Sequence, residues 1–160
     1  MRYALVFLFA AAIFGAPRAL PVISIKDQFD RPLSTAPFMR SSVAMLVYRS
    51  REASDSSLPQ ERECIAACRG STVIRLVDIS RAPFFVHGLI TGSLRTSEPS
   101  NACYLDFDGK AALPFGVPEN GVGYFLYTNG VLASERTFVY ASNNYRAQFD
   151  AFKAAARSLR

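Results

Sequence analysis

The chain has 160 residues, of which 50% are hydrophobic and 19% charged, and its formal net charge at pH 7 is +5. This length and composition are typical of one globular domain with a sizeable core, and they leave too little chain for a second one. The basic residues are scattered rather than gathered into blocks with aromatic residues, so no nucleic-acid-binding surface is expected.

The first nineteen residues differ in character from the rest. Arg2 supplies a positive charge, residues 3–14 are almost entirely apolar, and small residues follow around Ala16 and Ala19. Because the apolar run is shorter than the roughly 20 residues of a membrane-spanning helix, it predicts a secretory signal peptide over residues 1–19, cleaved after Ala16 or Ala19. The domain, residues 20–160, is then expected to be periplasmic or secreted. An uncleaved N-terminal segment is the alternative, and it would be the chain's only attachment to a membrane.

The first half of the domain predicts a strand, a helix and a second strand behind a short hairpin. The expected elements are the hairpin over 20–33, a buried strand over 43–48, a helix over 58–69 and a buried strand over 72–79. Alternation of apolar and polar residues indicates the hairpin, while apolar, β-branched runs indicate the buried strands. Pro59 and Glu61 are typical of a helix start, and Gly70 of a helix end. The two buried strands are therefore expected to be parallel, with a right-handed crossover.

The second half adds two helices and three strands. The expected elements are a helix over 83–95, a strand over 102–107, a strand over 122–127, its return strand over 131–140 and a helix over 143–159. The helices are indicated by apolar residues at three- and four-residue steps. Asn129-Gly130 predicts a tight turn, because both residues tolerate positive φ, so the flanking strands should pair antiparallel at a sheet edge. The adjacent Phe84 and Phe85 are expected in the core; an exposed position would instead suggest an interface.

This order of elements resembles the thioredoxin-like fold. Segments 104–112, 115–117 and 123–132 resemble the redoxin branch of that superfamily, and segment 25–32 resembles its opening hairpin. The resemblance implies an α/β, thioredoxin-like three-layer sandwich with a central mixed sheet of about five strands, an N-terminal hairpin and a C-terminal helix.

The sequence departs from this family at the turn after the strand over 43–48. Active members carry a Cys-x-x-Cys or one peroxidatic cysteine there, whereas residues 49–57 contain no cysteine. Active members also keep a cis-proline just before the strand that here begins at Val122, and the nearest proline, Pro118, lies four residues earlier. A serine hydroxyl in the turn has no nucleophilicity comparable to that of a thiolate. The departures predict a redox-inactive domain without catalytic residues or a cofactor.

Three cysteines lie outside that turn. Cys64 and Cys68 are four residues apart on the helix expected over 58–69, and Cys103 begins the strand expected over 102–107. Because the helix returns to the edge where parallel strands begin, a disulfide from Cys68, or from Cys64, to Cys103 fits the topology and an oxidising compartment. A Cys64–Cys68 bridge fits less well, since residues at i and i+4 of a regular helix point their Cβ atoms poorly for it. Buried thiols, and a redox or intermolecular role, are the alternatives.

Other common chemistries find little support in the sequence. His87 is the only histidine, and it lies in an apolar helical stretch where a hydrogen-bonded histidine is the ordinary case. A single histidine and a Cys-x-x-x-Cys spacing do not make a zinc site, so no metal is expected. No Gly-x-Ser-x-Gly motif supports a hydrolytic triad.

The preferred hypothesis for function is a redox-inactive, exported domain that binds a protein partner, as an accessory subunit of an envelope complex. The alternative is a thiol-disulfide oxidoreductase or peroxidase-like enzyme that uses the displaced residues Cys64, Cys68 and Cys103.

A third hypothesis concerns the cysteine-free turn itself. Arg49 and Arg51 follow a strand end and precede a helix, where basic side chains and a helix N-terminus attract anions. Together with the Asn120-Gly121 loop they predict a small-molecule site for an anion.

Overall fold

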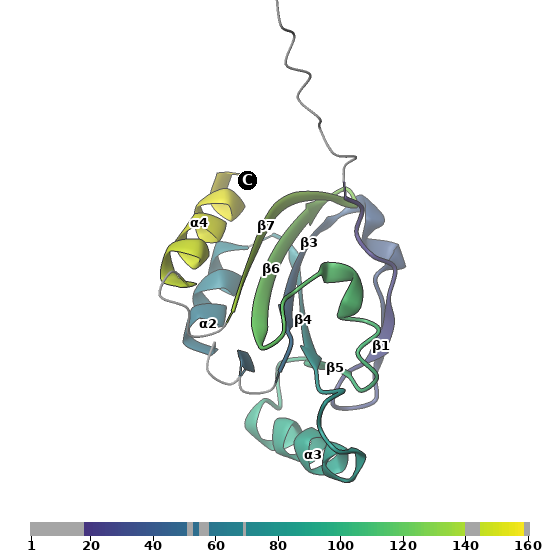
Figure 1. Ribbon diagram of the computed structural model, residues 1–160. Helices are drawn as coiled ribbons and strands as arrows, with labels where there is room; N and C mark the ends of the chain where they lie inside the picture. Colours follow the sequence, from purple (N-terminus) through teal and green to yellow (C-terminus); the bar gives the residue numbers. More distant parts are fainter. Residues whose placement is uncertain (1–17, 51–52, 55–57, 69, 140–144, 159–160) are drawn as a thin grey trace, which may run out of the picture.

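A five-stranded mixed sheet runs through the centre of the molecule (Figure 1). The computed structural model describes residues 18–50, 53–54, 58–68, 70–139 and 145–158. In spatial order the strands are β5 (Tyr104–Asp106), β4 (Thr72–Asp78), β3 (Ser42–Tyr48), β6 (Gly121–Thr128) and β7 (Val131–Val139). β3, β4 and β5 are mutually parallel, whereas β6 is antiparallel to both β3 and β7.

The sheet is covered on both faces. The helices are α2 (Leu58–Ala67), α3 (His87–Ser97) and α4 (Tyr145–Ser158), with 3₁₀ turns η1 (Ala36–Arg40), η2 (Phe84–Val86) and η3 (Leu113–Phe115). α2 and α4 lie against one face, and the hairpin of β1 (Ser24–Lys26) and β2 (Pro32–Ser34) lies on the other side with η3 (Figure 1). This three-layer arrangement with its N-terminal hairpin and C-terminal helix is the one predicted from the sequence.

Alternation along the central strand explains why there are two cores. Leu46 and Tyr48 of β3 enter the core under α2 and α4, whereas Met45 and Val47 enter the core under the hairpin and η3. All four side chains are fully buried. A strand that is covered on both faces has apolar residues at every position, which is why its sequence is a continuous apolar run.

The predicted hairpin turn is confirmed. Asn129 and Gly130 have φ angles of 52° and 74°, and β6 pairs antiparallel with β7 at the edge of the sheet. These positive values match the left-handed conformation that a two-residue hairpin turn requires.

The prediction that Phe84 and Phe85 lie in the core is wrong. Their exposed fractions are 84% and 70%. The chain forms the separate turn η2 before α3 begins, and the helix then buries Ile90 and Leu94 instead. Hydrophobic periodicity marked an apolar segment correctly but did not locate the start of the helix.

Residues 1–17 of the predicted signal peptide lie outside the described residues. The segment that follows lies against β7 at the edge of the sheet, where Ala19 forms an isolated β-bridge with Val131 and Leu20 is buried. Among the helices of the described part, none combines the length and the apolar character needed to cross a bilayer.

Candidate functional site

The carboxyl ends of β3 and β4 lie side by side because the two strands are parallel. Arg49 follows β3, and its Nε lies 2.8 Å from Oδ2 of Asp78, whose side chain is 3% exposed. Arg49 Nη1 also donates to the carbonyl of Val117 at 3.3 Å, and its backbone N–H donates to the carbonyl of Gly121 at 3.0 Å. The arginine at this turn is therefore held by internal partners.

A cavity of about 250 Å³ opens beside this ion pair. Its lining includes Arg49, Asp78, Arg81 and Asn120. The structure thus brings together Arg49 and Asn120 of the predicted anion site, with Gly121 in contact through its carbonyl, whereas Arg51 lies outside the described residues. Arg49 pairs with Asp78, and Arg81 pairs with Glu119 outside the lining. Anion binding at this turn stays a prediction, and the carboxylate partners weaken the attraction that it requires.

Ser50 begins a helical turn at the same edge of the sheet. Its Oγ accepts the N–H of Ala53 at 3.1 Å, and its carbonyl accepts the N–H of Ser54 at 3.2 Å. This is how a capping side chain satisfies the first amides of a helix. The hydroxyl of Ser50 therefore occupies a position that receives a backbone hydrogen bond.

A buried polar network lies beneath the turn. The side chain of Arg75, in the middle of β4, is 4% exposed, and its Nε lies 3.0 Å from Oε2 of Glu61 on α2. Its Nη2 donates to Ser54 Oγ at 2.7 Å, and its Nη1 pairs with Glu98 just past α3. Tyr48 OH donates to Glu61 Oε2 at 2.7 Å. The network thus joins two strands, α2, the turn and the end of α3.

Burial governs the ionisation of this network. It raises the pKa of Glu61 above its ordinary value even though Arg75 and the Tyr48 hydroxyl act in the opposite direction. Burial, the neighbouring Tyr124 and the Glu61 carboxylate raise the pKa of Tyr48 well above its ordinary value. This cluster was not predicted from the sequence, where its one local signal is a charged residue, Arg75, inside an apolar strand.

All three cysteines are thiols in the structure, and each is buried. Cys64, Cys68 and Cys103 lie in the same core, under α2, with exposed fractions of 0%, 3% and 0%. A hydrogen bond with Cys68 and burial raise the pKa of the Cys64 thiol far above its ordinary value. The disulfide from Cys68 to Cys103 stays a prediction.

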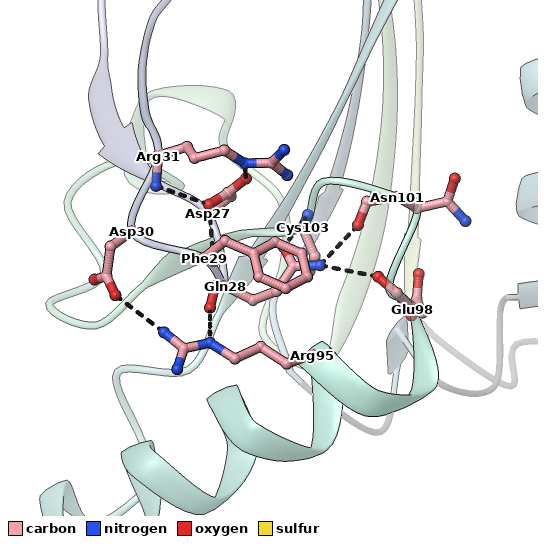
Figure 2. A network of polar contacts seen from close by, with 9 residues as sticks. All are labelled: Asp27, Gln28, Phe29, Asp30, Arg31, Arg95, Glu98, Asn101 and Cys103. Carbon is pink, nitrogen blue, oxygen red and sulfur yellow. Dashed lines mark hydrogen bonds and ion pairs between the residues drawn. The ribbon is translucent and has the colours of Figure 1, made fainter.

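Gln28 fixes the hairpin to the chain that enters β5 (Figure 2). Its Nε2 donates to the carbonyls of Asn101 and Glu98 at 2.7 and 3.2 Å, and its Oε1 accepts the N–H of Cys103 at 2.8 Å. Arg95 of α3 donates to the Gln28 carbonyl. The amide side chain, which is 0% exposed, has partners on both its oxygen and its nitrogen.

His87 has a structural partner, as the sequence suggested. Its Nε2 lies 2.8 Å from the carbonyl oxygen of Ala82, and its ring centroid lies 4.9 Å from that of Phe107. The described residues contain no cluster of three or more histidine, cysteine or acidic side chains arranged to hold a metal ion.

No family model matches this chain, and neither does any curated protein. Solved structures do match. The pneumococcal exposed lipoprotein thioredoxin Etrx1 from Streptococcus pneumoniae is 14% identical, with a TM-score of 0.60, over 84% of this chain and 99% of that chain. A secreted Mycobacterium tuberculosis disulfide oxidoreductase homologous to E. coli DsbE is 12% identical, with a TM-score of 0.58, over 83% and 95%.

A thiol peroxidase from Chromobacterium violaceum is similar to the same degree. It is 12% identical, with a TM-score of 0.62, over 89% of this chain and 86% of that chain. These identities are too low to assign an activity, but the structural similarity establishes the fold. The chain has the thioredoxin-like α/β fold that its sequence predicted.

Proposed function

We propose that this protein is an exported thioredoxin-like domain that binds a protein partner and performs no thiol redox chemistry. The observation that carries the proposal is the placement of the thiols. All three cysteines are buried under α2, while the turn after β3 presents Arg49, which is paired with Asp78.

The chemistry of thiols explains why this placement supports the proposal. The thiolate is the reactive species, and it forms when a helix N-terminus or a nearby cation lowers the pKa of an accessible thiol. The pKa of Cys64 is instead raised, by its hydrogen bond with Cys68 and by burial. An oxidant or a disulfide substrate would have to reach sulfur atoms inside a closed core.

Export is supported by the predicted signal peptide and by two similar structures. One of those proteins is described as an exposed lipoprotein and another as secreted. We therefore place this domain in the periplasm or outside the cell, where an accessory subunit of an envelope complex would act.

A thiol-disulfide oxidoreductase or peroxidase-like activity is the second candidate. It is favoured by the similar structures, which include a disulfide oxidoreductase and a thiol peroxidase, and by the contact between the Cys64 and Cys68 thiols. Cys103 would serve as the resolving residue. This activity requires the core under α2 to open during turnover.

Thiol titration and turnover assays separate the two candidates. We expect the native protein to show no thiol that reacts quickly with Ellman's reagent, and its thiols to react once the protein is unfolded in guanidinium. Mass mapping of the unreduced protein would show whether Cys68 and Cys103 form a disulfide. A structural disulfide and free buried thiols are both compatible with redox inactivity.

The turnover assays are insulin reduction with dithiothreitol and hydrogen peroxide consumption. The matched control is the variant C64S/C68S/C103S, with the three single variants in case the triple variant does not fold. Equal rates for wild type and thiol-free protein are expected. A wild-type rate above that of the controls would establish the enzyme instead.

A further inference from the structure

Three large apolar side chains are exposed together where α3 begins. Phe84 and Phe85 of η2 lead directly into the helix, and Leu89, four residues after Phe85, is 73% exposed. The rings of Phe84 and Phe85 meet edge to face, with their centroids 6.0 Å apart. We call these three side chains the α3 ridge. Clusters of exposed apolar residues of this kind mark interaction sites.

Two glycines stand next to the ridge on α3. Gly88 and Gly92 are exposed and one turn apart, so they share a face of the helix, and Gly92 neighbours Leu89. A Cβ at either glycine would meet no atom of the described residues within 4 Å, and neither glycine has a positive φ. Because glycine destabilises a helix relative to alanine, these two residues do not serve the helix itself. What they provide is a shallow surface, the glycine face, which another chain can approach closely.

The ridge and the glycine face point away from the core. Ile90 and Leu94 are the buried residues of α3, and they hold the opposite side of the helix against the rest of the molecule. Figure 1 shows α3 at one end of the molecule, apart from α2 and α4. The outer side of α3 is therefore accessible to a second molecule.

The charges around this surface are balanced. Arg81 and Arg95 are the only charged residues between positions 79 and 97. Arg81 pairs with Glu119, and Arg95 Nη2 lies 3.0 Å from Asp30 Oδ2 (Figure 2). All four side chains are between 46% and 74% exposed. A neutral rim of this kind gives no attraction to an anionic membrane, but it complements a surface that carries the same paired charges.

We propose that the α3 ridge and the glycine face bind a second copy of this chain about a two-fold axis. In a two-fold dimer both copies use the same surface, so that surface has to be complementary to itself. A convex ridge and a shallow face lie side by side on α3, and the ridge of each copy fits on the glycine face of the other. The exposed ion pairs at the rim exchange partners across the axis in the same way.

The exposed apolar area is sufficient for a small dimer interface. At these exposures the two phenylalanines offer roughly 150 Å² each and the leucine roughly 100 Å², which gives about 800 Å² over both copies. Because such interfaces are about 60–65% apolar, the whole contact would bury roughly 1,300 Å², near the lower limit for a specific interface. We therefore expect a dissociation constant in the micromolar range. The inference goes beyond the proposed function and does not depend on redox inactivity.

Sedimentation velocity of the purified protein tests for the dimer. We expect the sedimentation coefficient to rise from that of a monomer to that of a dimer between about 1 and 200 µM. Leu89→Ser should weaken dimerisation about tenfold or more, since one substitution acts twice in a two-fold interface. Leu113→Ser is the matched control, because Leu113 is 67% exposed on η3, outside the ridge, and it should stay within about twofold of wild type.

Gly92→Gln tests the glycine face. The new side chain has open space within one copy, and glutamine favours a helix more than glycine does, so the monomer should be at least as stable to urea as wild type. Dimerisation should nevertheless weaken about tenfold, because the side chain fills the space of the partner copy's ridge. Circular dichroism checks that each variant folds.

Photo-cross-linking locates the contact. With p-benzoylphenylalanine in place of Leu89, a mixture of isotopically labelled and unlabelled protein should give cross-links between copies. Mass mapping should place them within residues 84–96, as a two-fold contact through α3 requires.

Three results would overturn the proposal: a wild type that stays monomeric throughout this range, equal dimerisation of Leu89→Ser, Gly92→Gln and Leu113→Ser, or cross-links outside residues 84–96. Flotation of a monomeric wild type, but not of Leu89→Ser, with vesicles of phosphatidylglycerol and phosphatidylethanolamine would assign the ridge to a lipid surface instead. None of these results changes the thiol titration or the turnover assays, so failure of this inference and failure of the proposed function are distinguishable.

Discussion

Arg75 shows at the scale of one residue how a site can be hidden in a sequence. It stands in the apolar strand Thr72–Asp78, and its partners Ser54 and Glu98 are 21 and 23 residues away along the chain. A local pattern can flag a charge in a buried strand, but the carboxylates that make its burial tolerable come from other elements.

Removal of this buried cation is the first prediction. Arg75→Met should lower the free energy of unfolding by about 3–5 kcal/mol, because it leaves Glu61 and Glu98 without their partner. Arg81→Met is the control, since Arg81 and Glu119 are 62% and 55% exposed, and its cost should be at most about 1 kcal/mol. Urea denaturation measures both. Similar losses for the two variants would show that the network contributes no more than a surface ion pair.

The raised pKa of Glu61 predicts a pH dependence of unusual sign for an acid. Native Glu61 holds its proton more tightly than the unfolded chain does, for which the ordinary value is 4.5. The free energy of unfolding should therefore fall as pH rises from 4.5 through the raised pKa, since the native state binds more protons in that window. Glu61→Gln cannot titrate, so its stability relative to wild type should rise over the same window. Parallel stability curves, measured by urea denaturation at each pH, would contradict the assignment.

Ser50 offers a test of what the turn after β3 would do to a thiol. Ser50→Cys places sulfur where the N–H of Ala53 donates, at the start of a helical turn and next to Arg49. The thiol pKa should lie below its ordinary value of about 8.5. Ser80→Cys is the contrast, because Ser80 Oγ lies 2.6 Å from Asp78 Oδ1, and a neighbouring carboxylate raises a thiol pKa. The pH dependence of alkylation by iodoacetamide gives both values; a pKa for Ser50→Cys at or above that of Ser80→Cys would be evidence against the electrostatic argument.

Among the elements, the hairpin between β6 and β7 combines a turn with a tertiary contact. Gly130 has φ of +74°, and a Cβ there would lie 2.9 Å from the carbonyl oxygen of Met39 in η1. Gly116 has φ of +64° with open space around it. Alanine at either position should cost about 1 kcal/mol for the backbone conformation, and Gly130→Ala should cost a further 1–3 kcal/mol or so for the clash. Equal changes in midpoint on thermal or urea unfolding would show that η1 moves aside.

The elements also show which features could be predicted from the sequence and which could not. Buried strands such as β3 and β4 were predicted because burial on both faces leaves a continuous apolar run, and the turn at Asn129-Gly130 because few residues tolerate positive φ. The exposure of Phe84 and Phe85 was not predicted, since it depends on where η2 gives way to α3.

The candidate sites depended still more on tertiary structure. Arg49 and Asn120 were expected at one site, and they do line one cavity. Asp78, whose carboxylate pairs with Arg49, was predicted only as the end of a strand. The cavity between β1 and β5 has no sequence motif, because its lining comes from segments that are far apart along the chain.

Across the whole molecule, the two edges of the sheet differ in which segments cover them. The β5 edge meets the hairpin at one bridge and leaves a groove, whereas the β7 edge is covered at its start by the chain around Ala19. An open edge favours pairing with another polypeptide, and a covered edge prevents it.

If the predicted signal peptide is cleaved, the position of the cut decides whether the contacts of Arg18 and Ala19 at the β7 edge are kept. Leu132 N–H donates to the Arg18 carbonyl at 2.8 Å, and Arg18 Nη1 lies 3.1 Å from Glu135 Oε2. Cleavage after Ala16 would keep these contacts, whereas cleavage after Ala19 would remove them together with the bridge from Ala19 to Val131.

We expect a chain that starts at Leu20 to be less stable than one that starts at Pro17 by about 1–2 kcal/mol, the combined value of a backbone hydrogen bond and a partly exposed ion pair. Urea denaturation of the two purified chains measures the difference, and Arg18→Ala in the longer chain isolates the ion pair, whose loss alone should cost at most about 1 kcal/mol. Equal stability of the two chains would mean that residues 17–19 add nothing to the β7 edge. The intact mass of the protein isolated from its source cells tests the predicted cleavage itself and shows whether Arg18 and Ala19 are retained.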